Sequence, residues 1–203
     1  MANYFAYTNG ELAALAAKDK KLGQAIERIG RIDRVVQPDL FTALVESIIG
    51  QQISSKAATT IKDRLVTLTG GISAPAIAAL SDAEIQKCGM SHRKAGYVKA
   101  AADAVLSGDL DMSKLKEMDD EAAIAYLTKL PGVGIWTAEM LLIFSLQRHN
   151  VFSYGDLAIK RGLCKLHGHK NMPRERFERY RKRYAPYQSI ASLYLWHISG
   201  EPD

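Results

Sequence analysis

The sequence predicts an all-α protein, and three of its features support this class. Apolar residues recur at helical spacing, for example at Leu40, Leu44 and Ile48. Helix-capping residues precede such stretches, and Thr8 with Glu11 has the spacing of a capping box. The alternation of apolar and polar residues that is typical of strands does not extend over any useful length. We therefore expect helices joined by turns and short loops.

The predicted helices follow one another along the chain, and most have a recognisable start. Residues 1–39 predict two short helices, of which the second is capped by Asp19 and ends near Ile29. The later helices are expected to begin after Asp39, Ser54, Ser81, Ser91, Asp119 or Asp120, Gly134, Asp156, Pro173 and Pro186. Breaks are expected at Val36-Gln37-Pro38, Gly50-Gln51-Gln52 and Gly70-Gly71.

Length and composition indicate a folded protein with a sizeable core. The chain has 203 residues, of which 47% are hydrophobic. Its two cysteines, Cys88 and Cys164, lie far apart and have no ligand partners at metal spacing, so we expect no disulfide framework. The first residues lack the features of a signal peptide, and no apolar run is long enough to span a bilayer. We expect a cytoplasmic protein that does not contact a membrane.

Positive charge is concentrated near the C-terminal end. Residues 160–183 contain ten Lys or Arg and two Glu, a local excess of +8 in a chain whose net charge is +5, so the remainder carries −3. This distribution suits a surface that faces phosphates, although a solvated helix face is the alternative interpretation. His167 and His169 in this segment do not have helical metal spacing, and we expect them at the surface or in contact with phosphates.

The most informative stretch runs from Tyr126 to Lys160 and predicts a helix, a glycine turn, a second helix and a loop that ends in an acidic residue. Pro131 stops the first helix, and Gly132 and Gly134 permit backbone conformations that other residues avoid. The free N–H groups at the start of the second helix can hold a phosphate. Without side chains, the two glycines allow a nucleic-acid backbone to approach closely.

These residues resemble the helix-hairpin-helix DNA glycosylase superfamily, in which a hairpin of this kind is followed by an aspartate. The match is LPGVG-x-W-T-A and then VFSYGDLAIK, which places Asp156 at the position of that aspartate. The resemblance covers residues 35–203, and the C-terminal stretch resembles the alkylation-repair class named DNA-3-methyladenine glycosylase II. It implies two helical lobes with the hairpin, residues 121–147, spanning the cleft. Residues 40–148 would form one domain, and residues 1–39 with 149–203 the other.

The resemblance also implies a residue that enters the DNA. In alkylation-repair glycosylases, the junction matched by LVESIIGQQIS fills the gap left by the extruded nucleotide. Gln52 is the predicted wedge and Gln51 its neighbour, while a hydrogen-bonded turn is the alternative interpretation. Arg93 and Lys94 begin a helix, where a cation opposes the dipole, so we expect them to contact phosphates, with a solvated turn as the alternative interpretation. Lys160 is a further predicted DNA contact.

Asp156 is the predicted catalytic residue, and an ordinary helix-capping aspartate is the alternative interpretation. Cleavage of an N-glycosidic bond builds positive charge on the sugar, and a carboxylate beside it stabilises that charge or orients the attacking water. Trp136 and Trp196 match aromatic active-site positions of the alkyl-purine class, and Tyr154 lies just before the aspartate. Electron-rich rings attract a cationic methylated base. Two core tryptophans are the alternative interpretation.

The same resemblance bears on cofactors and on strand cleavage. Bifunctional relatives have a Schiff-base lysine where this chain has Trp136, so we expect no lyase activity. We also expect that the reaction requires no cofactor. Two scattered cysteines cannot supply the four ligands of an iron–sulfur cluster. The backbone carbonyls of Thr128, Leu130 and Gly132 match a family site for a monovalent cation, Na⁺ or K⁺.

The leading hypothesis is therefore a monofunctional DNA glycosylase that removes alkylated purines, such as 3-methyladenine and 7-methylguanine, in base excision repair. Its expected partner is double-stranded DNA with damaged bases, bound by a monomer. It would associate with the nucleoid in a bacterium or lie in the nucleus of a eukaryote. The alternatives are a glycosylase for uracil, hypoxanthine or an oxidised purine, and a DNA-binding hairpin module without catalysis.

Overall fold

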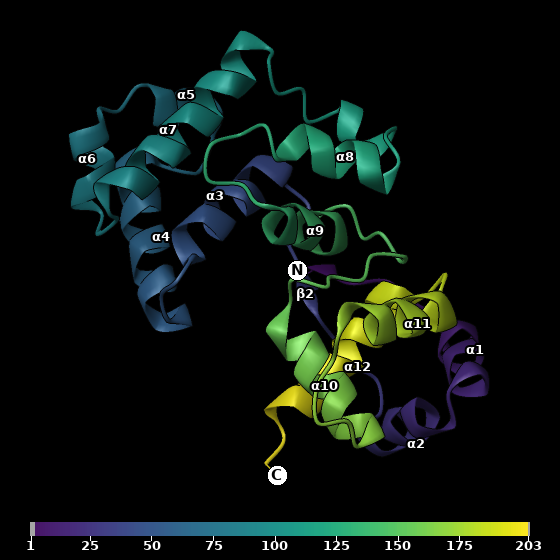
Figure 1. The fold of residues 1–203 in the computed structure, drawn as a ribbon. Helices are drawn as coiled ribbons and strands as arrows, with labels where there is room; N and C mark the ends of the chain where they lie inside the picture. The colour runs from purple at the N-terminus through teal and green to yellow at the C-terminus, as the bar shows by residue number, and fades with distance from the viewer. Residues whose placement is uncertain (1–2, 203) are drawn as a thin grey trace. The chain divides into compact units, whose positions relative to one another are not determined.

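The computed structural model describes residues 3–202 and confirms the all-α class (Figure 1). The chain divides into two compact units. Unit 1 contains the residues up to Val36 and those from Leu142 onward, and unit 2 spans Gln37–Leu141. The outermost residues of the predicted terminal domain, 1–2 and 203, lie outside the described residues. Within the described part of the chain, no helix is both long and apolar enough to cross a membrane.

Unit 2 is a set of helices gathered around α3 and α7. Its elements are α3 (Leu40–Gly50), α4 (Ser55–Thr69), α5 (Ala74–Ala78), α6 (Asp82–Lys87), α7 (His92–Ser107), the 3₁₀ turn η1 (Lys114–Lys116), α8 (Asp120–Leu127) and the first part of α9 (Ile135–Phe144). Leu44, Ile48 and Val98 are fully buried between these helices. The core of this unit therefore lies between α3, α7 and the helices packed against them.

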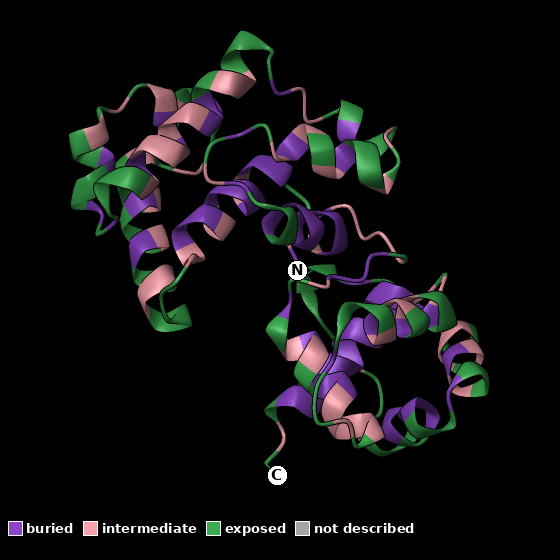
Figure 2. Cartoon of the chain, viewed as in Figure 1, coloured by how far each residue is buried: buried purple, intermediate pink, exposed green. Residues whose placement is uncertain are grey.

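Unit 1 joins the two ends of the chain. Its elements are β1 (Asn3–Tyr4), α1 (Asn9–Lys18), α2 (Lys20–Ile29), β2 (Val35–Val36), the end of α9, α10 (Leu157–His167), α11 (Arg174–Tyr184) and α12 (Gln188–Gly200). The strands form one short antiparallel pair, in which Asn3 faces Val36. The apolar surfaces of α10 and α12 are buried against each other within this unit (Figure 2).

Glycine permits the closest contact in unit 1. A Cβ atom built on Gly162 of α10 would lie 2.2 Å from the carbonyl oxygen of Leu195 in α12. Real Cβ atoms essentially never approach another heavy atom so closely. The spacing of the two helices therefore depends on the missing side chain.

Local capping chemistry explains where many helices begin. Thr8 with Glu11 and Ser81 with Glu84 form complete capping boxes, as their spacing predicts. Asp19 caps α2 by accepting from the N–H groups of Lys21 and Leu22, which also confirms its prediction. Several details differ from expectation: α5, η1 and the β1–β2 pair were not predicted, and α12 begins two residues after Pro186.

Candidate functional site

The predicted hairpin turn is a tight turn that favours proline followed by glycine. Pro131 and Gly132 occupy the two central positions of a turn closed by a 3.2 Å hydrogen bond from the Val133 N–H to the Leu130 carbonyl. Gly132 has a φ of 82°, which fits the third position of a type II turn and favours glycine. The chain then enters α9, whose first turn is exposed: Ile135 is 63% accessible to solvent.

The two hairpin glycines serve different purposes. A Cβ atom on Gly132 would lie 2.2 Å from the Tyr97 ring, so a side chain of this unit occupies the space beside it. A Cβ atom on Gly134 would meet nothing within 4 Å. Gly134 is therefore the position where an external backbone can come close, while Gly132 is required by its own turn and by Tyr97.

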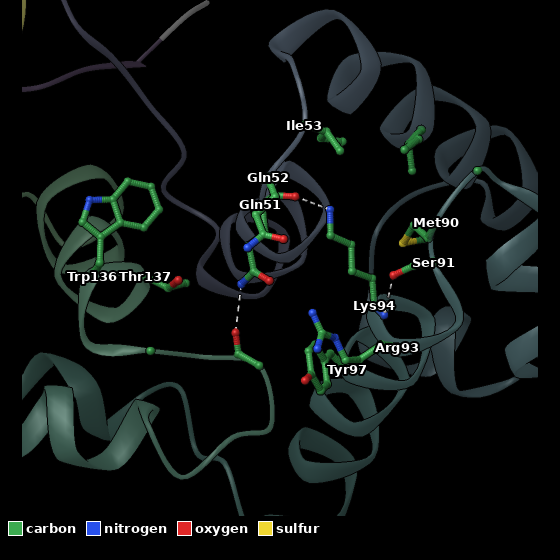
Figure 3. Close-up of a pocket in the computed structure, with 14 residues that line it drawn as sticks. Gln51, Gln52, Ile53, Met90, Ser91, Arg93, Lys94, Tyr97, Trp136 and Thr137 are labelled. Carbon is green, nitrogen blue, oxygen red and sulfur yellow. Dashed lines mark hydrogen bonds between the residues drawn. The ribbon is translucent and has the colours of Figure 1, made fainter. Parts of the chain in front are cut away.

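The predicted wedge turn follows the C-terminal end of α3. Gln51 directs its side chain at the hairpin, and its Nε2 donates a 2.8 Å hydrogen bond to the Gly132 carbonyl (Figure 3). Gln52 is exposed and has a φ of 57°, a left-handed conformation that costs a non-glycine residue about 1–2 kcal/mol. The wedge candidate is thus held in a strained turn that is anchored to the hairpin.

A cavity of about 570 Å³ lies beside the wedge turn and the hairpin within unit 2. Its walls include two cations, Arg93 and Lys94, and no acidic residue. Its remaining lining residues are Gln51, Gln52, Ile53, Ile61, Gly89, Met90, Ser91, Tyr97, Gly132, Gly134, Trp136 and Thr137. The structure brings together in this cavity most of the residues that were predicted to contact DNA. Its charge favours an anionic ligand.

Arg93 and Lys94 are neighbours in sequence but differ in environment. Arg93 is exposed at the mouth of the cavity, as expected for a phosphate contact. The ammonium group of Lys94 donates to the carbonyl of Gln51 (Figure 3) and to that of Ile49, at 2.8 Å. Burial lowers the pKa of Lys94. The phosphate contact of Lys94 stays a prediction, and nothing in the local sequence indicated these main-chain contacts.

Trp136 stands on the exposed first turn of α9. Its side chain is 45% accessible and borders the cavity of unit 2 (Figure 3). This exposure disfavours the alternative interpretation of Trp136 as a core anchor. Large aromatic side chains that remain open to solvent beside a cavity are suited to stacking on a ligand.

Asp156 lies in unit 1, at the start of α10. Its Oδ1 accepts hydrogen bonds from the N–H groups of Ala158, at 2.8 Å, and Ile159, at 2.9 Å. The residue is only 6% exposed, so the predicted catalytic carboxylate is tightly positioned. The helix dipole stabilises negative charge at this position. This N-cap role was the alternative interpretation of Asp156, and a fixed carboxylate is compatible with both roles.

The other predicted pocket residues of unit 1 differ in what surrounds their rings. Trp196 of α12 is partly exposed and packs against Phe144, with the two rings tilted by 34° and their centroids 5.4 Å apart. Tyr154 has the Lys160 ammonium 4.7 Å and the Arg174 guanidinium 5.0 Å from its ring centroid. Two cations at one ring disfavour a third, so Tyr154 is a poorer partner for a cationic base than Trp196. Lys160 itself is held at this ring.

The predicted cation site has oxygen donors of the right chemistry. Two of its three carbonyls already accept a hydrogen bond, that of Leu130 from Val133 and that of Gly132 from Gln51. A carbonyl oxygen has two lone pairs, so each retains capacity for a cation, as the Thr128 carbonyl does. Among residues 3–202, no cluster of three or more His, Cys, Asp or Glu side chains is placed to hold a metal ion.

A buried polar cluster in unit 1 was not expected from the sequence. Asp19 accepts from the Arg183 guanidinium, at 2.9 Å, and from the Tyr184 hydroxyl, at 3.0 Å, and lies 3.3 Å from the ring of His167. The expectation that His167 lies at the surface is wrong, because its side chain is 8% exposed. Burial lowers the pKa of His167 and outweighs the attraction of Asp19.

The chain is similar to known proteins over most of its length. Residues 45–186 match the family described as HhH-GPD superfamily base excision DNA repair protein. The chain is 33% identical over 168 residues to DNA-3-methyladenine glycosylase 1 of Schizosaccharomyces pombe, an alignment that covers 80% of this chain and 74% of the relative.

Solved structures extend this similarity to both units. The chain is similar to a DNA-3-methyladenine glycosidase from Bacillus halodurans, with a TM-score of 0.86 and 36% identity over 98% of this chain and 93% of the other. It is also similar to the 3-methyladenine DNA glycosylase of S. pombe in complex with abasic DNA, with a TM-score of 0.82 and 29% identity over 93% of this chain and 95% of the other.

Proposed function

This chain belongs to the HhH-GPD superfamily of base excision DNA repair proteins, and we propose that it is a monofunctional DNA glycosylase that hydrolyses the N-glycosidic bond of alkylated purines. The relatives named above are 3-methyladenine glycosylases. The observation that carries the proposal is the fixed carboxylate of Asp156, which follows the hairpin in the chain and begins α10.

Asp156 would act on the charge that develops at the sugar. As the bond to the base lengthens, the sugar becomes cationic, and a carboxylate that is already oriented stabilises it without reorganisation. The two backbone N–H groups of α10 hold one carboxylate oxygen in place, so its direction does not depend on the substrate. The same group orients the water that attacks the sugar.

Selectivity would come from stacking rather than from acid catalysis. A purine methylated at N3 or N7 already carries positive charge, so it leaves without a strong general acid. Trp136 and Trp196 present partly exposed rings, each of which attracts such a base by about 0.5–2 kcal/mol. Tyr154 already faces two cations, so we assign the base-binding role to the tryptophans.

The remaining residues would bind duplex DNA. Gly134 is open for a phosphate at the start of α9, Arg93 and Lys160 add positive charge, and Gln52 would fill the gap left by the extruded nucleotide. A Na⁺ or K⁺ ion bound to the carbonyls of Thr128, Leu130 and Gly132 would add positive charge near that phosphate. We propose that the protein binds as a monomer.

The test measures the release of bases from methylated duplex DNA by wild-type protein and by Asp156→Asn. Asparagine is also a good helix cap, so α10 should persist, while the rate should fall by about 10²–10⁴-fold. Equal rates for the two proteins would remove Asp156 from catalysis. Duplexes with uracil, hypoxanthine or 8-oxoguanine determine the lesion range. Release of one of these bases but no alkylated purine would refute the proposed substrate.

The absence of lyase activity needs its own measurement. Trp136 has no amine to form a Schiff base, so borohydride should trap no covalent adduct with lesion-bearing DNA. An adduct would show that another amine of the chain attacks the sugar and would overturn the monofunctional assignment.

A further inference from the structure

We propose that Lys94 is a positioning residue that holds the turn carrying Gln52 in the shape needed to enter DNA, an inference that rests on the proposed glycosylase function. Lys94 donates to the carbonyl oxygens of Ile49 and Gln51. Its ammonium group thus acts on the main chain immediately before the wedge candidate.

The C-terminal end of α3 provides the reason for this contact. The last carbonyls of a helix lack partners within the helix and carry partial negative charge. The Ile49 carbonyl belongs to this last turn, and the Gln51 carbonyl belongs to the residue that follows α3. A cation placed across both satisfies them together and fixes the direction in which the chain leaves the helix.

The turn would otherwise have freedom to relax. Gln52 has a φ of 57°, a conformation that non-glycine residues leave when nothing constrains them. Its preceding residue is held twice, because the Gln51 carbonyl accepts from Lys94 and the Gln51 side chain donates to the Gly132 carbonyl. These two contacts connect the wedge turn to α7 and to the hairpin.

The environment of Lys94 agrees with this role. The side chain lies partly buried beside the cavity, and burial lowers its pKa. The adjacent Arg93 remains exposed. The charge of Lys94 is therefore withdrawn from solvent and committed to the carbonyls, while Arg93 stays available to a phosphate.

The same helix supplies a matched control. Lys99 of α7 also donates to two carbonyls at a helix end, that of Ala78, the last residue of α5, and that of Leu80 just after it, but Lys99 does not line the cavity. Lys99→Met removes an equivalent pair of contacts without touching the wedge turn. Lys94→Met does the same at the turn, and Lys94→Arg restores the charge and the donors.

The experiment measures insertion into DNA separately from chemistry. A duplex with 2-aminopurine opposite an abasic-site analogue reports insertion by fluorescence and needs no turnover. We expect Lys94→Met to require about 10- to 100-fold more protein for the same fluorescence change. This factor corresponds to the loss of hydrogen bonds from a charged group. Lys99→Met should insert as the wild type does, and Lys94→Arg should retain most of the wild-type insertion.

The outcomes separate the two proposals. Base release from methylated duplex under single turnover should fall with insertion in Lys94→Met, with thermal unfolding as the check on folding. If Lys94→Met and Lys99→Met lose equal stability and equal insertion, Lys94 is merely structural and the inference is overturned. If Lys94→Met does not fold, Lys94→Gln, which keeps two donors, must show reduced insertion while folded. A wild type that inserts but releases no base would refute the glycosylase and leave the positioning role standing.

Discussion

Replacing Gly162 by alanine should destabilise unit 1, although alanine is the better helix former. The added Cβ would lie 2.2 Å from the carbonyl oxygen of Leu195, 2.8 Å from its carbonyl carbon and 3.0 Å from its Cα. All three atoms are backbone, so no side chain can rotate away, and α10 must shift from α12. Overpacking of this kind costs about 1–3 kcal/mol or more.

The expected net effect follows from two opposing terms. Glycine to alanine inside a helix stabilises it by about 1 kcal/mol, which offsets part of the steric cost. We take about 3 kcal/mol for the clash, because three backbone atoms are involved, and expect a net loss of about 2 kcal/mol. For a chain of this length, this lowers the melting temperature by roughly 4–8 °C.

A matched variant makes the measurement decisive. Gly96 lies in the middle of α7, and a Cβ atom there would meet nothing within 4 Å. Gly96→Ala should therefore raise the free energy of unfolding by up to about 1 kcal/mol. Melting is followed by circular dichroism and by tryptophan fluorescence, to which Trp196, the neighbour of Leu195, contributes. If Gly162→Ala proves as stable as Gly96→Ala, the close contact between α10 and α12 does not exist in solution.

Three further predictions test the site and the buried cluster. Gly132→Ala should lower the free energy of unfolding in denaturant by about 2–3 kcal/mol, because its φ is positive and Tyr97 occupies the space beside it. Gly134→Ala should fold normally but bind DNA about tenfold more weakly in a titration. Equal stabilities of the two variants would refute the distinction between the two glycines. Trp136→Ala should lower the rate of alkylated-base release and leave the melting temperature within a few degrees, so a large loss of stability would make it a core residue. Asp19→Asn should cost about 1–2 kcal/mol near neutral pH, because Arg183 loses its charged partner but is 44% exposed, so water compensates part of the loss. The cost should shrink in acid, and unfolding measured at several pH values tests this.

The acid dependence follows from the direction of the Asp19 shift. Burial raises the pKa of Asp19, but the hydrogen bonds from Arg183 and the backbone outweigh it, and the pKa ends below its ordinary value of 3.8. A group whose pKa is lower in the folded state stabilises the fold above its unfolded pKa. This contribution is lost as the pH falls below about 3.8 toward the folded value. A variant whose stability parallels the wild type through this range would contradict the argument.

Local chemistry explains what could be predicted from the sequence. The capping boxes at Thr8 and Ser81, the Asp19 cap and the Pro131-Gly132 turn depend on residues within four positions of one another. Such interactions depend on the spacing of nearby residues, so the helices and the hairpin could be predicted from the sequence. The N-cap geometry of Asp156 belongs to the same group.

Contacts between distant parts of the chain explain what could not be predicted. Lys94 reaches carbonyls more than forty residues earlier, and Tyr97 fills the space beside Gly132. Asp19 meets Arg183 across 164 residues of sequence. Neither spacing nor composition encodes these partners, because they depend on tertiary packing. Lys94 illustrates the result, since its charge suggested only a phosphate contact.

The construction of unit 1 from both ends of the chain has a consequence for synthesis on the ribosome. All residues of the hairpin turn emerge before α10, α11 and α12, and α10 cannot bury its apolar surface until α12 is available. A nascent chain arrested before Gln188 would therefore carry the complete hairpin turn but no partner for the apolar surface of α10. The fixed position of Asp156 at the start of α10 thus depends on a helix that is synthesised after it.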